Sequence, residues 1–174
     1  LPVELESIDK AKSSLFKLTW LINDLLDVSR IQAGTLELNR RPIELADAVQ
    51  EALAVLPPAD LERVTFLRPE EAHLVDADPH RIEQVVTNLV DNALKYSPSD
   101  EEVRVEVGRR GREVWLSVED HGPGIEPAEQ ERLFDRLFRG RRAVGSRIGG
   151  LGLGLYIVRD IVERHGGRVW VESE

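Results

Sequence analysis

Cysteine is absent from the 174 residues of the chain. Without cysteine there is no disulfide, no thiolate zinc site and no cysteine nucleophile, which excludes a zinc finger or a cysteine-based redox enzyme. No apolar run approaches the ~18–20 residues that cross a bilayer, and no segment has the pattern of a cleaved signal peptide. Positive charge is scarce, because 23 Lys and Arg stand against 32 Asp and Glu and leave a net charge of −9. This balance disfavours a general nucleic-acid binder.

The composition that remains is typical of a globular chain, with 41% hydrophobic and 32% charged residues. Its length predicts one compact domain with a short appendage. The chain starts at Leu1, which we interpret as a trimmed N-terminus.

We predict that residues 1–34 form this appendage as a long helix that ends at Gly34. Its apolar residues recur in alternating steps of three and four, a heptad-like stripe. The helix either packs on its own domain or forms one strand of a helical bundle. Since roughly 33 residues span about 50 Å, its length favours the bundle. The stripe consists of Ile8, Ala11, Leu15, Leu18, Ile22 and Leu25.

The rest of the chain alternates short helices and strands, with a hairpin pattern on either side of a turn at 108–112. Interspersed helices and hairpins favour a two-layer α/β sandwich over a doubly wound parallel sheet. The predicted helices span 46–56, 79–96, 128–134 and 151–165. The predicted strands span 35–39, 64–67, 74–77, 102–107, 113–119 and 168–173.

The predicted helix at 79–96 carries two asparagines and a lysine on one face. Asn88, Asn92 and Lys95 with Tyr96 are spaced three to four residues apart, so they share that face. Asparagine is a mediocre helix former, so two on one face need a reason. One explanation is a solvated polar face. The other is a ligand shelf, where amide oxygens bind Mg²⁺ beside phosphate oxygens and Lys95 adds a charge for an anion.

A second polar segment, from Asp120 to Ile125, follows directly after a predicted strand. Gly122 and Gly124 let a flat ligand approach the backbone there, because no Cβ intervenes. An ionised carboxylate only accepts hydrogen bonds, so Asp120 suits the exocyclic amine of adenine and would repel the carbonyl oxygen of guanine. A plain Asp/Gly/Pro turn explains the same residues.

A third segment has Gly150, Gly152 and Gly154 at alternate positions, with Leu151 and Leu153 between them. Glycines at a helix start expose backbone N–H groups, and the helix dipole adds positive potential, which favours a phosphate cradle over a flexible loop. The segment is not a P-loop, since no Lys-Ser/Thr follows, and its glycine spacing differs from the dinucleotide fingerprint.

Between the second and third segments lies Leu133–Arg139, followed by a stretch rich in Arg and Gly. Phe134 and Phe138 would anchor its base in the core. The stretch is either a mobile lid whose guanidinium groups meet phosphate oxygens or a solvated basic loop. Its arginines are Arg139, Arg141, Arg142 and Arg147.

In this order and spacing, the four segments resemble the catalytic ATP-binding domain of bacterial sensor histidine kinases. Asn88–Tyr96 is similar to the N box, Asp120–Ile125 to the first glycine box, Leu133–Arg139 to the phenylalanine box and Gly150–Leu155 to the second glycine box. Leu21–Gly34 resembles the end of the second helix of the dimerisation and phosphoacceptor domain.

The resemblance implies an α+β fold, a Bergerat-type two-layer sandwich with a mixed sheet of about five strands. It divides the chain into a dimerisation helix at 1–34 and an ATP-binding domain at 35–174. The fold is shared with the DNA gyrase B subunit, the heat-shock chaperones of about ninety kilodaltons and the mismatch-repair ATPases. The family's usual last strand, which has a Gly-Thr-Phe-like sequence, does not occur before Glu174, so we expect that strand to be missing.

The resemblance also implies that the cofactors are ATP and Mg²⁺. Asn92 would be the Mg²⁺ ligand, and the catalytic set facing the phosphates would be Asn88, Lys95 and Arg139. Tyr96 would lie against the adenine and Asp120 would accept from its amino group. The other residues at the nucleotide would be Gly122, Gly124, Ile125, Gly150, Leu151, Gly152, Leu153 and Gly154.

Asn88 distinguishes the possible reactions. Hydrolysing members of this fold carry Glu four positions before the Mg²⁺-binding Asn, and an amide there cannot act as a general base. The resemblance therefore favours phosphoryl transfer to a protein histidine. The alternatives are a non-catalytic module for ATP binding or dimerisation and an ATP-hydrolysing relative.

The expected partners follow from the same resemblance. None of His73, His80, His121 and His165 precedes an acidic residue and a Leu-Arg-Thr-Pro-like run, so the acceptor is expected on another helix of a parent kinase. The next acceptor would be a response-regulator receiver domain. We also expect a homodimer through 1–34 and a cytoplasmic chain whose parent is an inner-membrane sensor.

Overall fold

The computed structural model describes residues 18–19, 21–140 and 151–173. The chain divides into two compact units, residues 1–36 and 37–174. In the first unit residues 21–32 are helical, and the N–H of Thr35 donates to the carbonyl oxygen of Arg30 over 2.9 Å. Gly34 has a φ of 67°, in the left-handed region that favours glycine, so the predicted helix stop is confirmed. Ile8, Ala11 and Leu15 of the predicted stripe lie outside the described residues.

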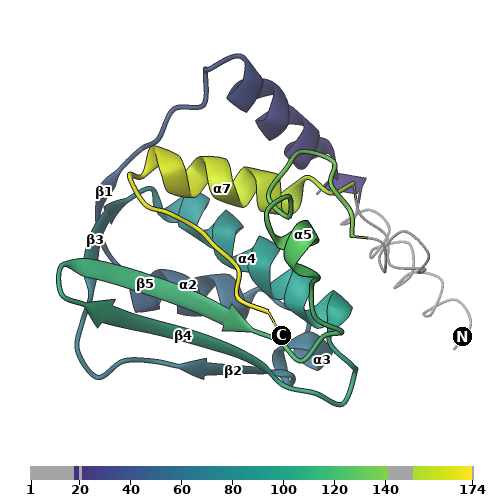
Figure 1. The fold of residues 1–174 in the computed structure, drawn as a ribbon. Coiled ribbons are helices and arrows are strands. Elements are labelled where there is room, and N and C mark those ends of the chain that lie inside the picture. The colour runs from purple at the N-terminus through teal and green to yellow at the C-terminus, as the bar shows by residue number, and fades with distance from the viewer. Residues whose placement is uncertain (1–17, 20, 141–150, 174) are drawn as a thin grey trace, which may run out of the picture. The chain divides into compact units, whose positions relative to one another are not determined.

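The strands of the second unit form two sheets (Figure 1). In the first sheet, β1 (Arg41–Glu44) pairs antiparallel with β3 (Leu74–Ala77). In the second, β4 (Val103–Arg110) lies between β2 (Val64–Leu67), to which it is parallel, and β5 (Glu113–Glu119), to which it is antiparallel. The predicted mixed sheet is confirmed, and the five strands are divided between a pair and a triplet.

Two predicted strands are wrong. The strand expected at 35–39 begins instead at Arg41, because its partner β3 ends at Ala77 and the next residue, Asp78, turns into a helix. The N–H of Asn39 donates to the Asp78 carboxylate over 2.8 Å and has no strand partner. The segment predicted as a strand at 168–173 has no strand pairing among the described residues. Its Ser173 is held by side-chain hydrogen bonds, where the hydroxyl oxygen accepts from the N–H of Ile125 over 2.9 Å.

The helices follow the predictions most closely where a cap defines the start. α4 (Pro79–Tyr96) has the predicted bounds, since the Asp78 side chain caps it and Pro79 occupies its first position. α2 (Leu45–Ala54) is capped by Glu44. The other helices are α3 (Pro58–Leu61), α5 (Pro127–Gln130) and α7 (Gly154–Arg164). α5 is shorter than predicted, and α7 starts three residues later because Gly152 has a φ of 69° and cannot begin a helix.

α2 and α4 pack on the sheet that contains β4, which gives the two predicted layers (Figure 1). α7 packs against α4 within the helical layer. The core therefore fixes α4 on two sides, and the polar residues of α4 are held at defined positions. The buried core residues are Leu45, Ala46, Val49, Ala52, Leu53, Val86, Val90, Val105 and Val107. None of the helices in the described part of the chain has the length and apolar character needed to cross a membrane.

Candidate functional site

Asn88 lies in the buried part of α4, with only 4% of its surface exposed. Its Nδ2 is buried and has no hydrogen-bond partner among the described residues. Leaving such a donor unpaired costs on the order of 1–3 kcal/mol, so the amide is a candidate to bind a ligand atom. A Cβ added to Gly154 would lie 2.7 Å from the Oδ1 of Asn88. The amide of the first motif therefore lies against the start of α7.

The other predicted residues of α4 lie toward its exposed end. Asn92 and Tyr96 are half-buried, and Lys95 is exposed. The Lys95 ammonium pairs with the carboxylate of Asp91, one turn earlier on the same helix. Exposed pairs of this spacing are worth only about 0.3–0.5 kcal/mol, so breaking the pair with Asp91 costs little.

The turn after β5 passes close to the end of α4. Asp120 Oδ1 accepts from the N–H of Gly122 over 2.7 Å. A Cβ at Gly122 would lie 2.6 Å from that same oxygen and 3.2 Å from the carbonyl oxygen of Tyr96, so a side chain there would displace the Asp120 carboxylate. Gly124 has a φ of 71°. The half-buried Ile125 is tied through its N–H to Ser173.

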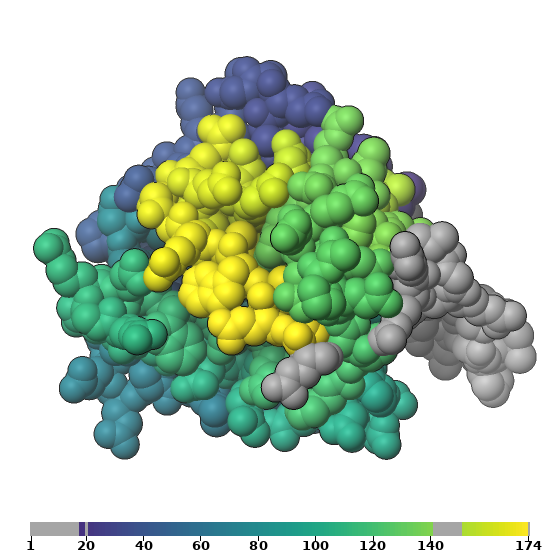
Figure 2. All heavy atoms as spheres, in the orientation of Figure 1, coloured from purple at the N-terminus to yellow at the C-terminus, as the bar shows by residue number. Residues whose placement is uncertain are grey.

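Gly152 joins the third motif to the segment that contains Phe134 and Phe138. Its carbonyl oxygen accepts from the N–H of Leu137 over 2.9 Å. A Cβ at Gly152 would lie 2.5 Å from the carbonyl oxygen of Phe138, and its φ of 69° is itself unfavourable for other residues. Leu137 also has a positive φ, 62°, the one such non-glycine value in the described residues. Figure 2 shows the green part of the chain that includes the phenylalanine segment beside the yellow C-terminal part on one face.

The first turn of α7 has no side-chain cap. Leu153, which precedes it, is buried and cannot accept a hydrogen bond through its side chain. The first N–H groups of a helix have no partner within the helix, and the helix dipole makes this end favourable for an anion. The predicted phosphate cradle therefore has a suitable helix end, although Gly150 lies outside the described residues.

The structure brings the predicted motifs together through their glycines. Gly122 lies on the end of α4, Gly154 lies on Asn88, and Gly152 lies on Phe138. Phe134 is buried, as predicted for an anchor, and Arg139 is half-buried. Leu151 is exposed. The arginines expected at 141, 142 and 147 lie outside the described residues.

Sequence reasoning missed two residues that hold these motifs. Ser97, which is 7% exposed, accepts through its hydroxyl oxygen from the N–H of His121 over 3.3 Å. Ser97 lies directly after a predicted helix and before Pro98, and this position was the sequence signal for a residue at the helix end. Leu137 links the phenylalanine segment to Gly152 by a backbone hydrogen bond. A pattern of side chains in the sequence does not predict such a contact.

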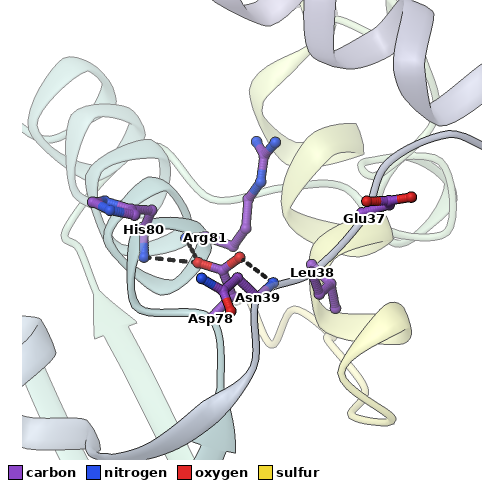
Figure 3. A pocket seen from close by; sticks show the side chains of 6 residues that line it. All are labelled: Glu37, Leu38, Asn39, Asp78, His80 and Arg81. Atoms are coloured by element: carbon purple, nitrogen blue, oxygen red, sulfur yellow. Dashed lines mark hydrogen bonds between the residues drawn. The ribbon is translucent and has the colours of Figure 1, made fainter.

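An open hollow of about 510 Å³ lies at the other end of α4, next to Asp78 (Figure 3). Burial opposes ionisation of Asp78, but hydrogen bonds from the N–H groups of Asn39, Arg81 and His80, with the charge of Arg81, outweigh it and hold its pKa below the usual range. The carboxylate is thus occupied by the backbone. The residues that line the hollow are Glu37, Leu38, Asn39, Asp78, His80 and Arg81.

Comparison with known proteins agrees with this arrangement. Residues 77–174, more than half of the chain, match the family described as "Histidine kinase-, DNA gyrase B-, and HSP90-like ATPase". The chain belongs to this family. The match begins just before the cap of α4 and includes all four motifs.

Relatives within this ATPase family are sensor kinases. Sensor protein KdpD of Escherichia coli K12 is 36% identical over 151 residues, which cover 87% of this chain and 17% of KdpD. Adaptive-response sensory kinase SasA of Synechococcus sp. JA-3-3Ab is 35% identical over 175 residues, which cover 98% of this chain and 46% of SasA. The chain thus spans less than half of the length of either relative.

One solved structure, full-length ShkA in complex with AMPPNP, is similar to this chain with a TM-score of 0.75 and 26% identity. The similarity covers 91% of this chain and 33% of ShkA. The α+β fold predicted from the sequence is therefore that of the family.

Proposed function

We propose that this chain is the ATP-binding catalytic part of a sensor histidine kinase, which transfers the γ-phosphoryl group of ATP to a histidine. The observation that carries the proposal is the buried amide of Asn88, which has no partner among the described residues and lies against the uncapped start of α7. A phosphate oxygen would accept from this amide and from the backbone N–H groups of α7. AMPPNP in the related ShkA supports a nucleotide as the ligand.

The turn after β5 would select the base. The exposed Asp120 keeps one carboxylate oxygen beyond the bond to Gly122, and an ionised carboxylate only accepts hydrogen bonds. Asp120 would accept from the exocyclic amine of adenine, while Gly122, Gly124 and Ile125 shape the turn. Tyr96, at the end of α4, would lie against the base.

Asn92 would hold Mg²⁺ together with the phosphates. The described residues contain no cluster of three or more His, Cys, Asp or Glu that could hold a metal. Mg²⁺ binds nucleotide sites through one or two protein ligands and otherwise through phosphates and water, so one amide oxygen fits this role. When bound, the ion would neutralise charge on the phosphates.

The chain's contribution to the reaction would be positioning and charge neutralisation. Asn88 would hold the phosphates against α7, Lys95 would leave Asp91 to approach them, and Arg139 would add a further positive charge. Gly150, Leu151, Gly152, Leu153 and Gly154 would line the phosphates. Because Asn88 cannot act as a general base for water, transfer to a histidine is favoured over hydrolysis.

The partners proposed for the whole kinase are the helix with the accepting histidine and a response-regulator receiver domain. A second copy of this chain is the proposed partner of residues 1–34, where large apolar side chains are exposed. A mass that doubles with concentration in sedimentation equilibrium would support this pairing, and a constant monomer mass would contradict it. These side chains include Leu21, Ile22, Leu25 and Leu26.

The base preference tests the proposal. We expect ATP and ADP to bind well in titration calorimetry and GTP to bind at least about tenfold more weakly, the scale of one hydrogen bond with a charged group. Asp120→Asn keeps the shape and adds a donor, so it should weaken ADP binding and bring GTP closer to ATP. Equal affinity of the wild type for ATP and GTP would contradict the role of Asp120.

The role of Asn92 is tested by the magnesium dependence of binding. Asn92→Ala should remove most of the gain in ATP affinity that Mg²⁺ produces, a loss of about 1–3 kcal/mol. Calorimetry with Mg²⁺ and with EDTA gives this difference directly, and binding without metal serves as the control. An unchanged Mg²⁺ dependence would refute the role.

A further inference from the structure

Arg63 precedes β2 and points its guanidinium at the end of α4. Nη1 donates to the carbonyl oxygen of Leu94 over 3.3 Å, and Nη2 donates to that of Pro98 over 2.6 Å. Nη2 also reaches the carbonyl oxygens of Ser97 at 3.5 Å and Glu101 at 3.4 Å. Within the described part of the chain, the partners of this side chain are all backbone oxygens, and its buried Nε has none.

The sequence explains why this helix end needs a donor. The carbonyl of Leu94 would normally accept from the N–H of residue 98, but residue 98 is proline and has no N–H. Arg63 supplies the missing donor, and its positive charge is favourable at the negative end of the helix dipole. The backbone of Arg63 is itself fixed to the sheet, because its carbonyl oxygen accepts from the N–H of Val103 over 2.8 Å.

The segment that Arg63 holds, residues 97–102, supports the turn after β5. The Ser97 hydroxyl accepts from the N–H of His121, and the Nδ1 of His121 lies 3.2 Å from the carbonyl oxygen of Glu102. The close approach of Gly122 to the carbonyl of Tyr96 completes this contact. Asp120 therefore belongs to a turn that is hydrogen-bonded, through His121, to the segment that Arg63 contacts.

We propose that Arg63 is a positioning residue for the base-binding turn, acting through residues 97–102 to place His121, Gly122 and so Asp120. The inference that this turn meets adenine rests on the proposed function. The inference that Arg63 positions the turn rests on the contacts alone. The two parts therefore need separate measurements.

Arg68, at the other end of β2, provides a matched control. It follows β2 as Arg63 precedes it, and its guanidinium donates to Gln50 over 2.7 Å and to Asp47 over 2.6 Å, both on α2. Arg68→Met removes a comparable hydrogen-bonded arginine without touching the end of α4. Arg63→Met removes the charge and the donors and keeps an unbranched side chain.

The first measurement is amide hydrogen exchange of the protein without nucleotide. Arg63→Met should speed exchange of the His121 amide about tenfold or more, the scale of losing one buried hydrogen bond, while the amides of α2 stay unchanged. Arg68→Met should leave the His121 amide within about twofold of the wild type. Arg63→Lys should restore part of the protection, because an ammonium still donates to one or two of the carbonyls. Ser97→Ala, which leaves Arg63 in place, should also expose the His121 amide.

The second measurement is ADP affinity by calorimetry, which should fall about tenfold in Arg63→Met and less than about twofold in Arg68→Met. Unchanged exchange at His121 in a folded Arg63→Met overturns the inference. If Arg63→Met does not fold, Arg63→Lys decides in its place, and wild-type exchange at His121 in that variant overturns the inference, with Ser97→Ala as the positive control for loss of the His121 hydrogen bond. A wild type that binds no adenine nucleotide would refute the proposed function, while the exchange data would still decide whether Arg63 positions the turn.

Discussion

The two helices that carry Asn88 and its neighbour Gly154, α4 and α7, begin in opposite ways. At the start of α4, the Asp78 carboxylate accepts from the N–H groups of His80 and Arg81 and also from Asn39. At the start of α7, the N-cap residue Leu153 makes no side-chain cap, and the residues before it in the sequence are glycines and leucines. In both helices the first N–H groups have no partner within the helix itself, and the helix dipole has the same direction.

The presence or absence of a capping side chain indicates whether a helix start can bind an external anion. The start of α4 has its own anion built into the chain, so the hollow beside it offers no free donors at the helix end (Figure 3). Among the described residues no carboxylate caps the start of α7, and the buried Asn88 amide next to it adds a donor. A capped end stabilises the fold, whereas an uncapped end next to an orphan donor is suited to a phosphate.

The largest effect is expected when the start of α7 is given an anion of its own. Asn88→Asp places a carboxylate against Gly154, where it would accept from the helix N–H groups and repel phosphates. We expect the affinity for ADP to fall about 10–100-fold, or about 1.4–2.7 kcal/mol, as measured by calorimetry.

Gln84→Glu is the matched control for Asn88→Asp. It makes the same change from amide to carboxylate one turn earlier on α4, where Gln84 accepts from the Nη1 of Arg81 over 2.7 Å. We expect its ADP affinity to stay within about threefold of the wild type, since charges at that distance are partly screened. Wild-type affinity in Asn88→Asp would remove α7 as the phosphate site.

Removing the anion from the start of α4 should affect stability and not nucleotide binding. Asp78→Ala leaves three backbone N–H groups without their acceptor and should lower the free energy of unfolding by about 1–2 kcal/mol. Urea denaturation measures this loss, and ADP affinity at 25 °C should be unchanged in the folded variant. Asp76→Ala, which removes only an exposed pair with Arg40, should change stability by less than about 0.5 kcal/mol. Similar losses in both variants would show that the cap contributes little.

The smallest expected effect is the pH dependence of that cap. The pKa of Asp78 lies below its ordinary value of 3.8 in the folded chain, so folding favours the ionised form. Its contribution to stability is present above pH 3.8 and is lost as the pH falls through the folded pKa. Urea denaturation from about pH 5 to about pH 2 should show a shallower acid loss in Asp78→Asn than in the wild type. Parallel curves would contradict this assignment.

The accuracy of the predictions differs between elements for a physical reason. α4 has the predicted bounds because its cap, its first proline and the Ser-Pro at its end are local signals. β2, β3 and β5 also lie where the apolar pattern predicts strands. The strand expected at 35–39 is wrong because a strand needs a partner, and β3 does not reach those residues.

The site shows the same division. The residue types of Asn88, Asp120 and the glycines predict where polar atoms and close backbone contacts occur. Their mutual contacts depend on packing, as when Gly154 lies on Asn88, 66 residues earlier in the chain. Arg63 carries no recognisable motif, and only the fold reveals that it reaches the carbonyls beside Pro98.

Local chemistry was thus readable in the amino acids themselves: the caps and stops of helices, the alternation of strands, the carboxylate after β5 and the glycines before α7. These features depend on neighbours within a few residues, whose spacing the chain fixes covalently. The tertiary structure decided which strands pair, why Gly152 must lack a Cβ, which side chains Gly122 and Gly154 approach, and which donor completes the end of α4. These depend on atoms that only folding brings within a few ångströms of one another, because packing has no counterpart in the linear order of residues.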